Sequence, residues 1–401
     1  MARGGSVHNG GRAPAGAGWM DTGTAGGLDA EARPRVVAAA ELTAMAESAL
    51  AHLGAPPDTA RAVAASLVEA NLVGHDSHGI RRLPIYARAV RLGRIDPAAR
   101  PEVAGRDGAV VTVRGHRAFG QIAAAAAVEA LEEVVRSHGI GIAAVRECNH
   151  IGRLGEYVEA LARAGHIGIA LCNVDPTVAP FGGRERRLGT NPLAWALPSG
   201  STVPGGEGGE PVVMDWATSA IAEGKLAMLR ARGERAPEGV LLDPAGRVST
   251  EPGDFYGGGA LLPFAGHKGY GLSVMIEAVG GLLSGGGIAC LPDYDGGNGT
   301  VLVGIDPGRF LPPEVFRAQV EDFTDELRRT PPAEGHPEVL VPGDVERRTR
   351  AERTAAGIPV PASAWNDLVA LLPPGAAARG AGGAPDGGAP PSGAEGPHPG
   401  R

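Results

Sequence analysis

The 401-residue sequence has few cysteines and no long apolar run. Its three cysteines, Cys148, Cys172 and Cys290, are odd in number and widely spaced. This excludes a disulfide framework and a CxxC metal or redox pair, and it favours a reducing compartment. No run of about 18 apolar residues occurs, and the N-terminus lacks the apolar stretch of a signal peptide. We therefore expect a cytoplasmic protein.

The sequence also lacks an excess of basic residues. The 37 lysines and arginines stand against 45 aspartates and glutamates, which leaves a formal net charge of −8. Such a charge repels a phosphate backbone, so nucleic acid is not an expected partner. The missing apolar run argues against a membrane as well. The length and the 43% hydrophobic content suffice for a substantial core and more than one domain.

Hydrophobic periodicity predicts an α/β protein between two low-complexity extensions, residues 1–36 and 374–401. The chain opens with two amphipathic helices and then alternates strands with helices, which is typical of packed α/β layers. The expected helices cover residues 41–53, 59–73, 121–137, 154–164, 219–232, 268–283 and 313–328. The expected strands cover residues 109–113, 139–145, 167–172, 212–215 and 300–305.

The segment GHDSHGIRRLPIY (74–86) concentrates groups that move protons and bind anions. His78 beside Arg82 suits reduction of a 2-oxo acid, because arginine grips the carboxylate while histidine donates a proton as hydride reaches the carbonyl carbon. The alternative is a helix cap, since Asp76 or Ser77 before an apolar-periodic segment is a good N-cap. The two interpretations are compatible, because helix N-termini bind anions.

A second acid/base candidate stands at the end of a strand. Asn149 and His150 follow a buried β-branched run directly. Strand ends in α/β sheets commonly carry functional sites, so His150 is a candidate for proton transfer. A hydrogen-bonded structural histidine is the alternative.

Three further segments offer groups suited to a cofactor. Residues 178–198 combine glycines with short polar side chains, although turn chemistry alone would explain them. The end of the strand at 215 suits N-capping or hydrogen bonds to cofactor hydroxyls and phosphate. Residues 265–281 place cationic groups at the mouth of an apolar helix, whose small residues could instead serve tight packing. The candidates are Gly182, Gly183, Thr190, Asn191, Asp215, Ala217, Thr218, Ser219, His267 and Lys268.

Three familiar signatures do not apply. GIGIAA (139–144) matches GxGxxA, but it follows a helix and is itself strand-like, the reverse of the context that a Rossmann site requires. His75 and His78 have no further ligands at metal spacing, so no metal is expected. Ser77 lies in no GxSxG elbow, which argues against a serine hydrolase.

In this order and spacing the segments resemble the malate/L-lactate dehydrogenase family of type-2, non-Rossmann NAD(P)-dependent oxidoreductases, which includes ureidoglycolate and sulfolactate dehydrogenases. The likeness runs from about Glu41 to Leu371. It rests on DSHGIRRLPIY, FGQIAAA, Asn149-His150, VAPFGGRERRLGTNPLA, DWATS, GALLPFAGHKGYGL and LVPGD.

The resemblance implies a non-Rossmann, sulfolactate dehydrogenase-like α/β fold with an N-terminal helical module and a layered mixed sheet. Residues 37–108 would form the substrate-side helical module and residues 109–300 the nicotinamide-binding domain. Residues 301–373 would return to the substrate side. The resemblance also implies a homodimer with each active site near the subunit interface.

The same resemblance implies roles for single residues. His78 would donate and accept the proton, and Ser77 would hold the substrate oxygen or the imidazole. Arg82 would clasp the carboxylate, and His150 remains a competing acid/base. NAD or NADP would be lined by Asp215, Ala217, Thr218, Ser219, His267, Lys268, Gly343 and Asp344, with Gly182, Gly183, Thr190 and Asn191 on the nicotinamide side.

Two positions depart from the family pattern. Val174 follows Asn173 where relatives often have a hydroxyl residue, and Trp216 stands where methionine is usual. Val174 is therefore expected to lack one hydrogen bond to the cofactor or substrate. The larger Trp216 side chain is expected to occupy more space beside the cofactor site. Neither change removes the acid/base, so we expect an active enzyme.

The sequence is thus interpreted as an oxidoreductase that transfers a hydride between a nicotinamide and C2 of a small 2-oxo/2-hydroxy acid. NAD and NADP are equal alternatives, because no Rossmann acidic residue marks the ribose site. A second interpretation is a cyclic imino acid (C=N) reductase of the same family. A third is a non-catalytic ligand-binding relative, against which the intact His78 and Arg82 argue.

Overall fold

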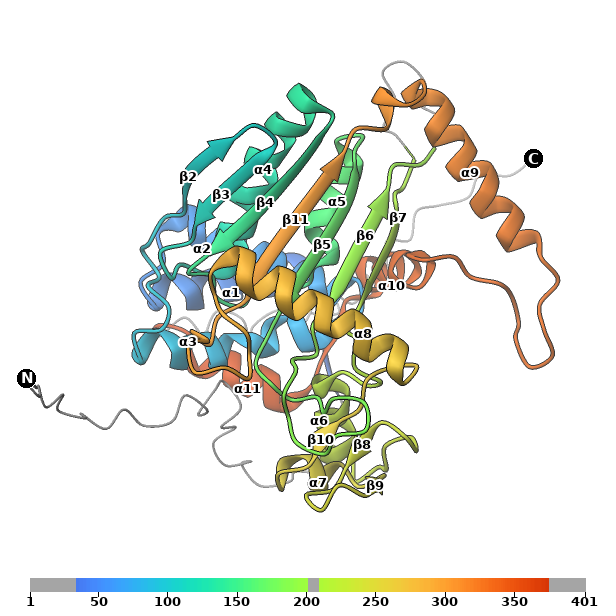
Figure 1. Cartoon of the computed structure of the whole chain (residues 1–401). Coiled ribbons are helices and arrows are strands. Elements are labelled where there is room, and N and C mark those ends of the chain that lie inside the picture. Colours follow the sequence, from blue (N-terminus) through green and yellow to red (C-terminus); the bar gives the residue numbers. More distant parts are fainter. Residues whose placement is uncertain (1–33, 201–208, 375–401) are drawn as a thin grey trace, which may run out of the picture.

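A seven-stranded mixed sheet forms the centre of the molecule (Figure 1). The computed structural model describes residues 34–200 and 209–374, so the predicted extensions lie almost wholly outside the described residues. The strand order is β2-β3-β4-β11-β5-β6-β7. The strands are β2 (Glu102–Asp107), β3 (Val110–Arg114), β4 (Ile140–Arg146), β5 (Ile167–Asn173), β6 (Leu193–Leu197), β7 (Val212–Trp216) and β11 (Gly299–Ile305).

The late strand β11 occupies the middle of this sheet. Val301 pairs with Ala144 of β4 on one side and with Leu171 of β5 on the other, both antiparallel. Of the neighbouring strand pairs, β3 and β4 run parallel and the others are antiparallel. The start of β11 therefore lies beside the ends of β4 and β5. The predicted α/β class with a mixed sheet is confirmed.

Helices cover both faces of the sheet. The helices α4 (Gly120–His138) and α5 (Gly155–Arg163) pack on one face, where Leu131 and Val158 are fully buried. The helix α8 (His267–Ile276) crosses the other face in Figure 1, and a π-helical turn (Glu277–Leu282) continues it. Ile276 is buried there against Leu171 and Val301.

A helical layer lies below the sheet in Figure 1 and has its own core, which includes Leu42, Leu67, Tyr86 and Leu368. The strand β1 begins inside the segment expected to be an extension, because Arg35 pairs with Val360. The two ends of the described chain therefore meet in this layer. Its elements are β1 (Arg35–Val37), α1 (Ala39–His52), α2 (Pro57–Leu72), α3 (Leu83–Arg91), β12 (Ile358–Val360) and α11 (Ala362–Ala370).

A small lobe and two further helices complete the fold. The lobe packs around Leu226 and Phe255. It comprises α6 (Glu223–Ala231), β8 (Leu241–Leu242), β9 (Val248–Ser249), α7 (Pro252–Tyr256) and β10 (Ala260–Leu261). The helix α9 (Pro313–Arg329) projects away from the sheet, and α10 (Asp344–Ala356) returns to it (Figure 1). In the described part of the chain, no helix meets the length and apolarity that crossing a membrane requires.

Most predicted elements are confirmed to within a few residues, one predicted helix was wrong at its start, and the strands β2 and β6 were not predicted. The helix expected from residue 219 begins at Glu223, because Ser219 instead forms a β-bridge with Pro263. The helix expected over 268–283 is confirmed, with its second half, Glu277–Leu282, in π-helical form. GIGIAA forms most of β4, with Gly139 in a left-handed helix-ending conformation, so this stretch is no phosphate-binding turn.

Candidate active site

A cavity of about 160 Å³ lies where the ends of β4 and β5 meet the start of β11 and the helical layer. Its lining includes His78, Arg82, His150 and Thr190. These four predicted site residues come from three separate segments of the chain, and the fold brings them to one cavity. The cavity is therefore the candidate active site.

Two short 3₁₀ turns, Asp76–His78 and Ile80–Arg82, shape the segment that carries His78. Asn71 holds this loop from inside, because its Oδ1 accepts from the Ile80 N–H at 3.0 Å. A Cβ at Gly79 would lie 2.2 Å from that oxygen, so only glycine allows the approach. Neither Asp76 nor Ser77 caps a helix, so the cap interpretation was wrong.

The C-terminal helix α10 anchors the same loop from outside. Arg353 donates to both carboxylate oxygens of Asp76, at 2.7 and 3.1 Å. His75 lies 3.3 Å from Glu346 on the same helix. A bidentate arginine–carboxylate pair fixes orientation as well as distance. The position of the active-site loop thus depends on residues almost 280 positions later in the chain.

The guanidinium of Arg82 is oriented by the loop itself. Its Nε donates to the Ser77 carbonyl oxygen at 2.7 Å. No carboxylate in the described ranges 34–200 and 209–374 forms an ion pair with Arg82. The terminal nitrogens of Arg82 therefore remain available for an anion in the cavity.

The two imidazoles of the cavity stack on each other. The ring centroids of His78 and His150 are 5.5 Å apart, with 23° between the planes. The Ser77 hydroxyl lies 3.0 Å from Nδ1 of His78. Burial, together with the positive charge of Arg82, lowers the pKa of both histidines well below the usual range. Both rings are therefore neutral at pH 7.

The cavity also contains a thiol. Cys172 is fully buried and accepts a hydrogen bond from Asn298 Nδ2 at 3.2 Å. Burial raises the pKa of Cys172 to about 11. The thiol therefore stays protonated and is a poor nucleophile. Proton transfer and anion binding, rather than covalent catalysis by cysteine, are the chemistry this cavity supports.

The polar segment before β6 is held by buried hydrogen bonds. Asn191 is fully buried, and its Nδ2 donates to Glu277 at 2.7 Å while its Oδ1 accepts from the Val174 N–H at 3.2 Å. Thr218 Oγ1 donates to the carbonyl oxygens of Thr190 and Asn191, each at 3.0 Å. These contacts join two of the predicted cofactor segments beside the cavity.

The predicted cofactor residues near the small lobe do not line the cavity. Gly182 and Gly183 are exposed, as are His267 and Lys268 in the first turn of α8. The two segments are neighbours, because the ring centroids of Phe181 and His267 are 6.1 Å apart. Ala217 is half-buried and Ser219 Oγ donates to the Ile221 carbonyl at 2.8 Å.

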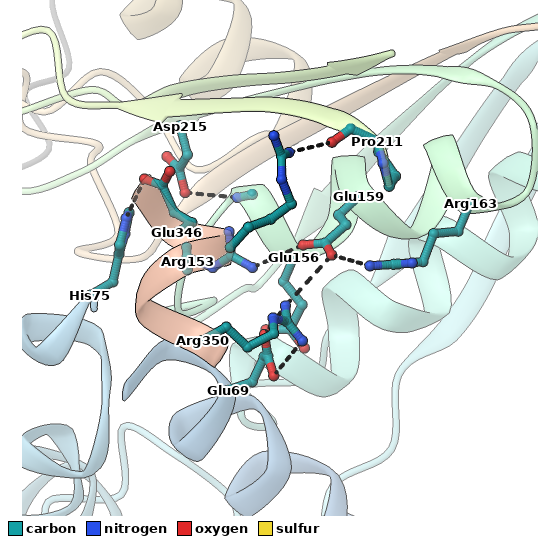
Figure 2. A network of polar contacts seen from close by, with 12 residues as sticks. Glu69, His75, Arg153, Glu156, Glu159, Arg163, Pro211, Asp215, Glu346 and Arg350 are labelled. Carbon is teal, nitrogen blue, oxygen red and sulfur yellow. Dashed lines mark hydrogen bonds and ion pairs between the residues drawn. The ribbon is translucent and has the colours of Figure 1, made fainter. Parts of the chain in front are cut away.

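Asp215 and Gly343 lie at a different place, beside Arg153 and Glu159. Figure 2 shows Asp215 next to the ion network there. Asp215 accepts from the Gly155 N–H at 2.7 Å, and burial raises its pKa. With Gly343 it borders a small polar cavity of about 30 Å³. Asp344 is buried and pairs with Arg328 at 2.9 Å. The structure thus divides the predicted cofactor residues between two regions.

The network itself joins four elements. Arg153 is buried and donates to Glu159 of α5 at 3.2 Å. Glu159 also forms an ion pair with Arg163 at 2.8 Å and a longer one with Arg350 of α10 at 3.6 Å. Figure 2 shows these side chains converging with Glu69 of α2 and Asp215 of β7. The network therefore ties the helical layer to the sheet.

Sequence reasoning assigned no role to two residues that the structure places at the site. Tyr86 lines the cavity, and Gln121 donates to its hydroxyl at 2.8 Å. Tyr86 is four residues after Arg82, a spacing that places both on one side of a helix. Gln121 is the polar exception on the buried face of an alanine-rich helix. Both patterns can be seen in the sequence, but neither shows that Tyr86 and Gln121 contact each other.

The residues present fit a nicotinamide cofactor. Besides Arg82 and the imidazoles, the cavity lining contains the apolar side chains of Ile151, Leu154, Val174 and Pro192. A flat aromatic ring suits an apolar surface, whereas a guanidinium suits a small carboxylate. The same cavity thus offers surfaces for both reactants of a hydride transfer.

Comparison with known proteins gives consistent matches. The family model for malate/L-lactate dehydrogenase matches residues 37–369. L-lactate dehydrogenase of Cupriavidus necator is 38% identical over 335 residues, which cover 82% of this chain and 94% of that protein. The structure of sulfolactate dehydrogenase from Methanocaldococcus jannaschii has a TM-score of 0.75 at 31% identity, with 84% of this chain and 96% of that chain covered. Δ1-piperideine-2-carboxylate reductase from Pseudomonas syringae has a TM-score of 0.74 at 32% identity, with 84% and 99% covered.

The fold, the cavity and these matches define a dehydrogenase that acts on 2-hydroxy acids. The chain belongs to the malate/L-lactate dehydrogenase family. The resemblance predicted from the sequence motifs is thereby confirmed, as is the enzyme class. A dehydrogenase of this family implies a nicotinamide cofactor.

Proposed function

We propose that this enzyme transfers a hydride between NAD or NADP and C2 of a small 2-oxo/2-hydroxy acid, with His78 moving the proton and Arg82 binding the carboxylate. The observation that carries the proposal is the meeting of Arg82, His78 and His150 in one cavity. An arginine without a carboxylate partner attracts an acid substrate, and a neutral imidazole can accept its hydroxyl proton.

When bound, the reduced cofactor supplies the hydride. The chain's own residues provide orientation and the proton. Arg82 holds the carboxylate, Ser77 steadies the His78 ring, and the apolar lining excludes water from the reacting atoms. We propose Thr190, Thr218 and the neighbouring candidates Asn191, Ala217 and Ser219 for the cofactor, together with the exposed groups Gly182, Gly183, His267 and Lys268. Asp215, Gly343 and Asp344 are proposed for its more distant part.

A cyclic imino acid is the second candidate substrate. One solved relative is a piperideine-2-carboxylate reductase, whose named substrate also carries a carboxylate beside the reducible bond. Arg82 would bind that carboxylate in the same way, and C=N would replace C=O. The two candidates differ in the reacting atom and not in the anchoring group.

The proposal is tested by absorbance at 340 nm with NADH and then NADPH. The panel contains pyruvate, oxaloacetate, sulfopyruvate, 2,3-diketogulonate and cyclic imino acids. Oxidation of one cofactor with a 2-oxo acid supports the proposal, and turnover only with the imino acids supports the second candidate. No turnover and no calorimetric binding of either cofactor would reject both.

Replacing Arg82 by glutamine is expected to lower kcat/KM by roughly 10- to 150-fold, mainly through KM. The reason is that hydrogen bonds to a charged group contribute about 1.5–3 kcal/mol. Lysine at this position should restore only part of the loss, because it lacks the bidentate fork. Arg81→Gln is the matched control, since it removes the same charge and Arg81 does not line the cavity. Equal losses in both variants would contradict a specific role.

The pH dependence should differ between the two directions of the reaction. Burial and Arg82 lower the pKa of His78, so the imidazolium that reduction needs forms only below that lowered pKa. kcat/KM for reduction should therefore rise as pH falls through it, while kcat/KM for oxidation should be level above it and decline below. Profiles measured in both directions test this. Reduction that becomes faster with rising pH would contradict it.

We also propose a homodimer in the cytoplasm. The helix α9 projects from the body (Figure 1) and exposes Val315, Phe323 and Leu327, a pattern that favours burial against a second copy. The three cysteines are unpaired, which suits a reducing compartment. Light scattering should give twice the mass of the chain, and Phe323→Glu should shift the protein toward monomer. Wild-type protein that is monomeric at micromolar concentration would contradict the dimer.

A further inference from the structure

The two histidines of the cavity differ in the groups that face their Nδ1 atoms. Nδ1 of His78 lies 3.0 Å from the Ser77 hydroxyl. A hydroxyl both donates and accepts, so it can serve His78 in either tautomer. Nδ1 of His150 accepts instead from the Gly152 backbone N–H at 3.2 Å. A backbone N–H only donates, so this contact requires a lone pair on Nδ1 of His150.

The Tyr86 hydroxyl can also donate to Nδ1 of His150, sharing its lone pair with the Gly152 N–H. Tyr86 Oη lies 2.8 Å from Nδ1 of His150, and Gln121 Nε2 donates to the same oxygen at 2.8 Å. Because Tyr86 Oη already accepts from Gln121, its own proton can be donated to His150. Both Tyr86 and Gln121 are buried, so water does not compete for these bonds.

The remaining ring nitrogen of His150, Nε2, then carries the proton of the neutral imidazole. Within the described residues, Nε2 of His150 forms no hydrogen bond to the protein, and it is not among the buried polar atoms that lack a partner. His150 also lines the cavity. The free N–H is therefore available to a molecule in the cavity.

We propose that His150 is held as the neutral Nε2–H tautomer and donates a hydrogen bond to the substrate oxygen without exchanging its proton, while His78 alone moves the proton. Tyr86 is then a positioning residue that acts through His150. This inference rests on the proposed function, and it assigns different roles to the two acid/base candidates.

The surroundings of His150 disfavour its charged form. Arg82 and His78 act on it electrostatically, and neither carries a negative charge. Burial raises the pKa of the contacting Tyr86 hydroxyl to about 12, so this group carries no negative charge either. The carboxylates of Asp175 and Glu223 line the same cavity, and neither is hydrogen-bonded to His150 in the described residues. Protonation of Nδ1 would turn an N–H toward the Gly152 N–H, which cannot rotate away. Burial acts in the same direction and lowers the pKa of His150. A catalytic acid usually has the opposite arrangement, in which a carboxylate or carbonyl accepts from the second ring nitrogen.

The tautomer can be measured without any turnover. Long-range ¹H–¹⁵N NMR of the histidine-labelled protein, with His150 assigned by its loss in His150→Gln, should show Nδ1 unprotonated and Nε2 protonated between about pH 5 and pH 8. Tyr86→Phe should move the His150 signals toward a tautomer mixture. A proton on Nδ1 of His150, or titration of His150 in this range, would overturn the inference.

Activity of paired variants tests the role. Glutamine can place an N–H close to the position of Nε2, whereas asparagine mimics Nδ1. We expect His150→Gln to stay within about tenfold of wild type and His150→Asn and His150→Ala to lose about 10²–10³-fold in kcat, as when one preorganised donor is removed. His78→Gln should be as inactive as His78→Ala.

The outcomes separate the two proposals. His150→Gln as inactive as His150→Ala would overturn the donor role. Wild-type protein without turnover on the whole panel would reject the proposed function and with it the role toward substrate, whereas the NMR result would still decide the tautomer.

Discussion

Replacing His78 by alanine is expected to lower NAD(P)H oxidation by about 10²–10⁴-fold, the usual contribution of general acid–base catalysis. His78 lines the cavity beside Arg82, and His150 cannot replace it if its Nδ1 keeps accepting from Gly152. Cofactor binding should be nearly unchanged, because the imidazole acts on the substrate side. Steady-state rates at 340 nm and calorimetry with NADH or NADPH measure the two effects separately.

His75→Ala is the control for this experiment. His75 belongs to the same loop, but its ring contacts Glu346 and does not line the cavity. It should therefore lose far less activity than His78→Ala. Wild-type activity retained in His78→Ala would favour a different proton donor, and an inactive wild type would favour the non-catalytic alternative.

Replacing Arg153 by methionine is expected to lower the free energy of unfolding by about 3 kcal/mol. Removing one partner of a buried ion pair typically costs about 3–5 kcal/mol, because the other charge stays buried. Only 3% of the Arg153 side chain is exposed, and it pairs with Glu159. Arg163 and Arg350 still compensate Glu159 in the variant, which places the loss at the lower end. Urea denaturation measures it.

Arg163→Met is the matched control for Arg153→Met. It removes an arginine from the same glutamate, but 47% of the Arg163 side chain is exposed, so the loss should be at most about 1 kcal/mol. Similar losses in both variants would show that burial does not determine the strength of this network.

Local patterns predicted five of the seven strands of the sheet but missed β2 and β6, and they singled out three residues that the structure brings to one cavity. The β-branched run before Asn149-His150 forms β4, and His150 does follow a strand end. Arg82 and His78 share one loop, so their proximity was already set by spacing. The five strand predictions succeeded because each depends on contacts within a few residues, where periodicity decides the structure.

Long-range placement could not be predicted in the same way. The sequence did not show that the side-chain amide of Asn191 donates to Glu277, 86 residues later. A polar side chain has the same sequence signal whether its partner is a cofactor or a buried glutamate. Likewise, nothing local shows that the Asp215 side chain lies beside Glu346 of α10, since that arrangement depends on how α10 returns to the sheet.

The position of β11 has a consequence for synthesis of the chain on the ribosome. Gly299 pairs with Asn173, 126 residues earlier. The edges of β4 and β5 that pair with β11 therefore stay unpaired while the intervening chain is synthesised. At about 5–20 residues per second this interval is roughly 6–25 s. During this time two apolar strands expose unpaired edges, which are sites of aggregation. The nascent protein therefore depends on shielding of these edges, and its active site forms only after translation is nearly complete.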